Sequence, residues 1–324
     1  VIPLFVEAGN ATDYNLAMLK LTHRINDSHA YTGGGVINSI FGIYYPRFMF
    51  VFAEDETVIY KVDNSISDIK PGDIIRAIDG CEISALRDSL SQYARGSNDL
   101  AVSNYVNSYI LTGPSGSFDI TVEDETGIHT HTFTRDWNNT TFNNFMANTG
   151  PVWYDTLVNE SCLIGYVDMG RLTTSEVEVM MDDLWETDAI IIDIRNYPQG
   201  TLWTLVDYLF PEPIHIANFT VPNKNYPGVL FWSEETIGSI NSDVYQGQLL
   251  ILFDIRTISQ AEYTVMGLEQ YPGSIKIGST TKAADGNVSQ VFLPGNLFTY
   301  FTGLGTFYPD YTPTQREGII PDIE

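Results

Sequence analysis

The sequence predicts an α/β fold, α+β overall, in which a parallel-rich sheet domain follows a β-rich module and an N-terminal helical segment. Residues 13–28 carry apolar side chains at helical spacing. Short apolar runs bounded by turn residues fill residues 42–140, as is typical of a small β-rich module. After Gly150-Pro151, apolar runs alternate with amphipathic helical patterns, which favours parallel strands. The expected domains are 1–41, 42–140 and 150–324.

The amino-acid composition limits the kinds of molecule that we expect the protein to bind. The 324 residues include 41 acidic and 16 basic side chains, giving a net charge of −25. Such a surface repels phosphate groups, so we expect neither nucleic acid nor an anionic membrane as a partner. No apolar run reaches the roughly 18 residues that would span a bilayer. Few Lys and Arg with many Asn, Thr and Tyr are typical of a bacterial extracytoplasmic enzyme, and we expect this location, with any export signal already removed.

The two cysteines, Cys81 and Cys162, are too far apart for a paired metal motif and too few for a disulfide framework. We therefore expect two buried thiols.

The N-terminal helical pattern ends at a serine-histidine pair. Leu16, Leu19 and Ile25 fit one helical face, and the pattern stops at Ser28-His29. The glycines of residues 33–35 follow and require a tight or irregular turn. We expect a helix that carries Ser28 and His29 to the edge of a loop.

The β-rich module has regularly spaced turn signals. Asp79-Gly80 is expected to join two extended segments as a tight turn. His129 and His131 alternate on one strand, but a third metal ligand is missing, so no metal site is predicted. The stretch 96–114 reads as an insertion rich in Asn, Ser and Tyr. The expected strands are 48–52, 58–62, 74–78, 118–122 and 129–133, with a helix at 84–94.

The third section alternates strand and helix. Thr173 or Thr174 is expected to cap the first of its helices. In parallel sheets of this kind, sites form where strands end and helices begin. The expected strands are 163–167, 189–194, 249–253 and 274–277, and the expected helices are 175–186, 202–210 and 260–270.

Ser259 lies at such a junction, between the strand 249–253 and the helix that follows it. A serine on a strand-to-helix elbow exposes its hydroxyl and has helix N-terminal amides beside it, which can stabilise an oxyanion. Ser259 is therefore a candidate nucleophile. The alternative is that it only caps the helix.

Several motifs together resemble the tail-specific, or C-terminal processing, serine protease superfamily, which includes the tricorn core protease. They are Asp193–Asn196, Arg256–Glu262, Ile277–Thr281 and Gly318–Ile323, and residues 69–80 are similar to the family's PDZ-like module. The resemblance implies a crotonase-like catalytic domain, a PDZ-like domain that binds an extended chain end, and cleavage of proteins or peptides. It implies no cofactor.

The resemblance also assigns the base. The C-terminal processing enzymes use a lysine after the nucleophile, but that position here holds Asp285. The tricorn branch uses histidine in a Ser-His pair, which matches Ser28-His29. We therefore expect His29 to be the general base for Ser259, with Ser28 as a supporting hydrogen-bond donor.

A glutamate supports this pair in the tricorn branch, and the matching position holds Gln315. A neutral orienting group stabilises imidazolium less well, so slow turnover is expected. Glu317 would serve only if the loop were shifted.

The oxyanion hole is expected to use the amide of Gln260. The second donor is expected to be Gln199 or Gly200, or to be absent, because Pro198 has no N–H. Asp193 and Arg195 have a structural interpretation, either as an ion pair or as contacts that brace the loop at the strand end. The aromatic-rich stretch 210–232 is a candidate substrate-binding wall.

A second hypothesis is a non-catalytic member of the same scaffold that binds peptides or lipophilic ligands, similar to the interphotoreceptor retinoid-binding proteins. Pro198 and Gln315 favour it, whereas Ser259 with Ser28-His29 favours the peptidase. A crotonase-like acyl-CoA enzyme is set aside, because no basic cluster for phosphates is present. The oligomeric state is left open.

Overall fold

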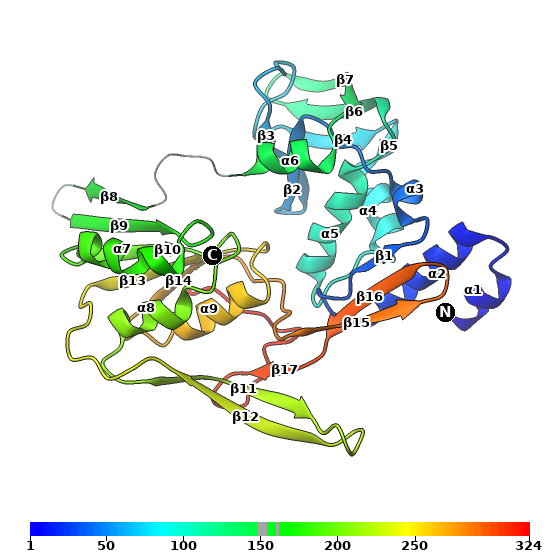
Figure 1. Ribbon diagram of the computed structural model, residues 1–324. Coiled ribbons are helices and arrows are strands. Elements are labelled where there is room, and N and C mark those ends of the chain that lie inside the picture. Colours follow the sequence, from blue (N-terminus) through cyan, green and yellow to red (C-terminus); the bar gives the residue numbers. More distant parts are fainter. Residues whose placement is uncertain (148–153, 160–161) are drawn as a thin grey trace. The chain divides into compact units, whose positions relative to one another are not determined.

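The computed structural model describes residues 1–147, 154–159 and 162–324 (Figure 1). The expected boundary at Gly150-Pro151 lies outside the described residues. Two compact units make up the chain. The first comprises Val1–Asn26, Ala30–Thr149 and Gln290–Tyr300, and the second comprises Asp27–His29, Gly150–Ser289 and Phe301–Glu324. The tripeptide Asp27–His29 therefore folds with the C-terminal half of the sequence.

The first unit contains a six-stranded sheet in the order β2-β3-β4-β6-β7, with β5 paired to β4. Its elements are α1 (Ile2–Glu7), α2 (Ala11–His23), β1 (Thr32–Gly34), α3 (Ile37–Phe41), β2 (Phe48–Ala53), β3 (Glu56–Val62), β4 (Ile74–Ile78), β5 (Cys81–Glu82), α4 (Ile83–Ser91), α5 (Asp99–Leu111), β6 (Gly116–Asp124), β7 (Gly127–Arg135) and α6 (Asn139–Met146). The strands expected here are all present.

The core of this unit lies between the sheet and its helices. Phe48, Ile75 and Ile120 are buried with Val106 and Ile110 of α5. Thus most of the stretch that reads as an insertion is a helix that closes the core. Asn98 caps this helix by accepting a hydrogen bond from the Ala101 amide at 2.8 Å.

The second unit is built on a five-stranded sheet in the order β14-β13-β10-β9-β8. Its first four strands are parallel, and β8 runs antiparallel to β9. Its elements are β8 (Tyr154–Asn159), β9 (Cys162–Asp168), the 3-10 helix η1 (Thr174–Glu176), α7 (Val177–Leu184), β10 (Ala189–Asp193), α8 (Leu202–Leu209), β11 (Ile214–Pro222), β12 (Leu230–Ile237), β13 (Gln248–Phe253), α9 (Gln260–Leu268), β14 (Ile275–Gly278) and β17 (Gly305–Phe307). The predicted α/β class is confirmed.

Apolar faces of α7, α8 and α9 pack in one core with this sheet. Met180, Leu205 and Val265 are each fully buried in it, together with Ile192 and Ile251 of the central strands. Thr173 forms the capping box that begins the first helical turn, which settles the choice between Thr173 and Thr174. The core therefore fixes the carboxyl ends of β10 and β13, where the candidate residues follow.

Two further sheets have three strands each, in the orders β12-β11-β17 and β1-β16-β15. The strands β15 (Val288–Leu293) and β16 (Leu297–Thr302) run from one unit into the other along the chain. The sequence patterns did not indicate these sheets.

The prediction of buried thiols is wrong, because Cys81 and Cys162 are both exposed. Each opens a strand: Cys81 follows the Asp79-Gly80 turn, and Cys162 begins β9. The first residue of a strand can lie at the surface, whatever the average burial of the residue type.

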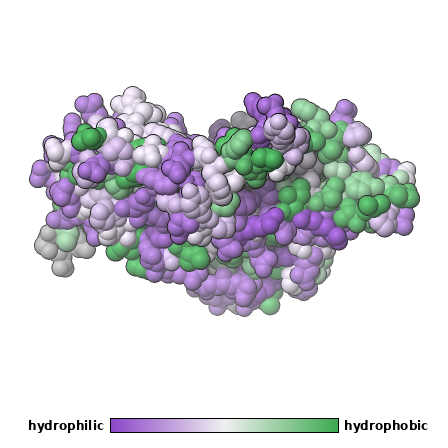
Figure 2. Space-filling view, turned by 90° about the horizontal axis from the view of Figure 1, so that it is seen from below, coloured by the Kyte–Doolittle hydropathy of each residue, from purple (hydrophilic) through white to green (hydrophobic). Residues whose placement is uncertain are grey.

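The surface carries the polar residues that the composition implies. On the face shown in Figure 2, hydrophilic side chains predominate, and hydrophobic ones form separate groups. Within the described ranges, no helix combines the length and the hydropathy that crossing a membrane requires.

Candidate active site

Ser259 occupies a strained elbow between β13 and α9. It is the N-cap of α9, with φ 59° and ψ −127°, a conformation that costs free energy for any residue with a Cβ. The backbone is held there by a 2.8 Å hydrogen bond from the Ser259 amide to the Ala284 carbonyl. Ser259 also caps α9 through its side chain and lines a cavity, so the two sequence interpretations are compatible.

Glu262 joins the elbow to the segment 281–284. Its buried carboxyl group accepts hydrogen bonds from the amides of Ser259 at 3.1 Å, Ala283 at 2.9 Å and Ala284 at 3.0 Å. The Thr281 hydroxyl donates to the same group. Burial raises the pKa of Glu262 to about 7 despite these donors. The elbow is therefore fixed from inside the protein.

The segment 281–284 also anchors the Ser-His pair. Ser28 is fully buried, and its hydroxyl donates to the Lys282 carbonyl at 2.7 Å. The carbonyls of Lys282 and Ala284 thus hold Ser28 and Ser259, respectively. Two residues of chain span at most about 7 Å. The structure therefore brings the predicted Ser28-His29 pair and Ser259 to the same short segment.

His29 takes part in a hydrogen-bonded network. Its Nδ1 lies 2.9 Å from Thr302 Oγ1, and Thr302 donates to Asp27 Oδ1 at 2.9 Å. A carboxylate only accepts, so the threonine proton belongs to the bond with Asp27 and its oxygen accepts from His29 Nδ1–H. This assignment leaves His29 Nε2 as the basic nitrogen. The imidazole is largely buried, with 10% of the side chain exposed.

Asp27 is the centre of this network. Its buried carboxylate accepts hydrogen bonds from the His29 amide at 2.9 Å and the Thr302 amide at 2.6 Å. Gln315 Nε2 donates to it at 3.1 Å, so the predicted orienting residue contacts the acid of the network. Glu317 is exposed.

Asp27 and Thr302 were missed in the sequence. Asp27 precedes Ser28 directly, and this adjacency is the signal that would have found it. Thr302 is 273 residues from His29 and lies in a polar-aromatic strand, where nothing marks it.

The candidate oxyanion donors lie on two elements. Gln260 begins α9, and a Cβ built on Gly200 would lie 3.5 Å from Gln260 Nε2, so the loop that contains Gly200 reaches the start of this helix. The Gln199 side chain donates instead to the Gly170 carbonyl at 2.8 Å. Beside this loop, Asp193 and Arg195 form the predicted ion pair at 2.6 Å.

Asp285, at the position of the family lysine, is buried. Burial first, and then the nearby Glu262, raises the pKa of Asp285 well above its usual value. The raised pKa favours the protonated carboxylic acid, a form that cannot take a proton from Ser259.

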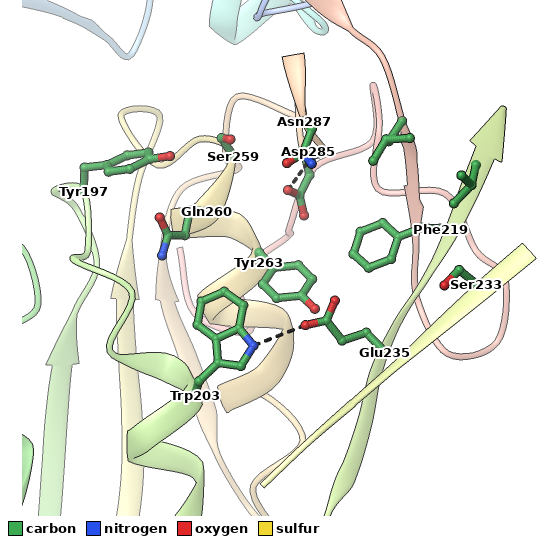
Figure 3. Close-up of a pocket in the computed structure, with 13 residues that line it drawn as sticks. Tyr197, Trp203, Phe219, Ser233, Glu235, Ser259, Gln260, Tyr263, Asp285 and Asn287 are labelled. Atoms are coloured by element: carbon green, nitrogen blue, oxygen red, sulfur yellow. Dashed lines mark hydrogen bonds between the residues drawn. The ribbon is translucent and has the colours of Figure 1, made fainter. Parts of the chain in front are cut away.

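A cavity of about 470 Å³ opens beside Ser259 (Figure 3). It is bounded by α9, α8 and the β11–β12 hairpin, so part of the stretch 210–232 does line a cavity, although Trp232 packs on Phe307 and Tyr311. Its lining residues are Tyr197, Trp203, Phe219, Val221, Ser233, Glu235, Ser259, Gln260, Tyr263, Asp285, Gly286, Asn287 and Leu304. The part of the chain that the structure describes holds no cluster of three or more His, Cys, Asp or Glu suited to a metal ion.

Comparisons with known proteins indicate the family and the fold of the chain. The sequence profile of peptidase family S41 matches residues 163–324. Among curated proteins, no significant match is found. Mature CPAF in complex with lactacystin superposes with a TM-score of 0.74 at 13% identity, covering 99% of this chain and 86% of that one. The photosystem II D1 C-terminal processing protease gives 0.53 at 13% identity, covering 98% and 84%.

The profile and the fold define a serine-type peptidase, which acts on proteins or peptides. The chain belongs to peptidase family S41. The expected relationship to the C-terminal processing proteases is thereby confirmed.

Proposed function

We propose that Ser259 is the nucleophile of this peptidase and that His29 is its general base. The observation that carries the proposal is the shared anchor: Ser28 and Ser259 bond to carbonyls two residues apart, at Lys282 and Ala284. This arrangement supports proton transfer between Ser259 and His29, the residue that follows Ser28.

In the proposed reaction, Ser259 Oγ attacks the carbonyl carbon of the scissile peptide bond while His29 Nε2 accepts its proton. The imidazolium then gives this proton to the leaving amine. Asp27 stabilises the positive charge through the Thr302 hydroxyl. Water then attacks the acyl-enzyme with the same proton transfers through His29, which releases the new carboxyl end and regenerates Ser259.

The developing oxyanion needs preorganised donors. We assign the Gln260 amide at the start of α9 and the Gly200 amide of the facing loop. Gly200 is preferred over Gln199 because Gly200 lies against the Gln260 side chain.

A fluorophosphonate probe tests the assignment. We expect one adduct, mapped to Ser259 by mass spectrometry, and none in Ser259→Ala. His29→Ala should slow both labelling and peptide hydrolysis by about 10³-fold or more, because the proton then has no acceptor. The exposed His129 provides the matched control, and His129→Ala should behave as the wild type.

Absence of label on folded protein, or labelling of Ser259 at the normal rate in His29→Ala, would contradict the proposal. The first result would favour a binding member of the scaffold.

A further inference from the structure

The cavity beside Ser259 is walled by aromatic rings from three elements. Tyr263 of α9 stacks on Trp203 of α8 with ring centroids 5.8 Å apart, and on Phe219 of β11 at 6.0 Å. Figure 3 shows these rings around the space below Ser259. Flat aromatic walls suit a long side chain that lies along them.

The hairpin β11–β12 presents a carboxylate to the same space. Phe219 pairs with Ser233, and Glu235 lies two residues further along β12, so all three side chains share one face. Glu234 points to the opposite face because strand side chains alternate. Glu235 accepts a hydrogen bond from Trp203 Nε1 at 3.2 Å (Figure 3).

A second carboxyl group borders the cavity. Asp285 is 4% exposed and directs its carboxyl group toward the same space (Figure 3). Its Oδ1 accepts from the Gly286 amide at 2.6 Å, whereas its Oδ2 is buried and has no hydrogen-bond partner among the described residues. A buried polar atom in this state is costly unless a ligand supplies the partner.

The charge of the cavity determines which kind of ligand group it can bind. Among the described residues that line it, none is Lys, Arg or His. An anionic guest would be repelled by Glu235. An apolar guest would desolvate this carboxylate without compensating its charge. A cation would pair with Glu235 and lie on aromatic faces, as ammonium groups do in aromatic cages.

We propose that this cavity receives a lysine or arginine side chain of the substrate. Since Ser259 lies at the cavity, the side chain that enters is that of the residue whose carbonyl Ser259 attacks. The peptidase then cleaves after basic residues. This substrate class rests on the proposed role of Ser259.

Paired peptides test the preference. The two peptides differ only at the residue before the scissile bond, lysine or norleucine, so only the ammonium group changes. We expect kcat/KM to favour lysine by about tenfold or more. Glu235→Gln, which keeps an oxygen for Trp203, should remove most of this preference. Glu234→Gln makes the same charge change on the other face and should keep it.

Binding separates this inference from the catalytic assignment. On Ser259→Ala protein, calorimetry with Nα-acetyl-lysine methylamide should show tighter binding than with the norleucine analogue, and Glu235→Gln should abolish the difference. This preference can hold even if Ser259 proves not to be the nucleophile. Equal binding of both ligands, a norleucine preference in kcat/KM, or equal effects of the Glu234 and Glu235 variants would overturn it.

Discussion

At the scale of single residues, the link between His29 and its acid is a hydroxyl group. Nδ1 of His29 is 4.0 Å from Asp27 Oδ1, which is too long for a direct hydrogen bond. Thr302 bridges the two at 2.9 Å on each side. In the proposed mechanism, the threonine therefore fixes the tautomer of His29 and transmits the charge of Asp27, which makes Thr302 a positioning residue.

Thr302→Val removes this bridge while keeping the shape of the side chain. We expect kcat/KM to fall by about 10²-fold or more, because Nδ1 loses its acceptor. The acidic limb of the pH profile should move to lower pH, because the imidazolium loses its link to Asp27. Thr302→Ser restores the hydroxyl and should recover activity to within a few-fold. If both variants lose kcat/KM equally and the acidic limb of the pH profile does not move, Thr302 contributes only through packing.

At the scale of elements, the segment 281–285 organises the site. It holds Ser28 and Ser259 through its carbonyls and contacts Glu262 through its amides. It also carries Asp285. Two acids with raised pKa values, Glu262 and Asp285, therefore lie against this segment or on it. Burying either carboxyl group costs less free energy when the group is protonated than when it is charged.

Stability should consequently fall as pH rises. The unfolded Glu262 titrates near 4.5 and the folded one near 7, so between these values the folded chain holds more protons than the unfolded one. The free energy of unfolding then decreases with pH across this window, by about 3 kcal/mol for this group. The raised pKa of Asp285 acts in the same direction.

Asp285→Asn isolates this effect, because the amide cannot ionise. In urea unfolding at pH 5 and pH 8, we expect the variant to lose less stability than the wild type and to be the more stable protein at pH 8. Glu212 is exposed, so Glu212→Gln should follow the wild type. Parallel behaviour of Asp285→Asn and wild type would contradict the assignment.

The elements differ in how far the sequence reveals them. Buried parallel strands such as β10 and β13 are continuous apolar runs, and the sequence predicts them almost to the residue. The hairpin β11–β12 is largely exposed on β12, with aromatic and acidic residues mixed, so no period of two emerges. The composition of residues 210–232 therefore suggests a wall of a binding site, but it does not show which side chains of the hairpin line the cavity.

At the scale of the whole molecule, the net charge of −25 acts on substrates before they bind. A cationic peptide is attracted over roughly one Debye length, which salt shortens. We expect kcat/KM of the lysine peptide to fall several-fold between ~50 mM and ~500 mM NaCl, while the norleucine peptide changes little. An equal change for both peptides would show that the charge does not steer the substrate.

The candidate site was predictable where a residue type signals its chemistry. Ser259, Ser28 and His29 could be named because an elbow serine and a Ser-His pair are recognisable in a sequence. Glu235 and Thr302 could not, because the roles proposed for them rest on contacts across long chain separations. The PDZ-like interpretation of residues 42–140 stays a prediction.

The tripeptide Asp27–His29 belongs to the second unit although its sequence neighbours belong to the first. Its partners Lys282 and Thr302 lie 254 residues after Ser28 and 273 residues after His29, respectively. A nascent chain therefore carries its histidine long before the serine and the threonine exist. Under the proposed mechanism, the order of synthesis keeps the growing polypeptide catalytically silent until Thr302 has been made.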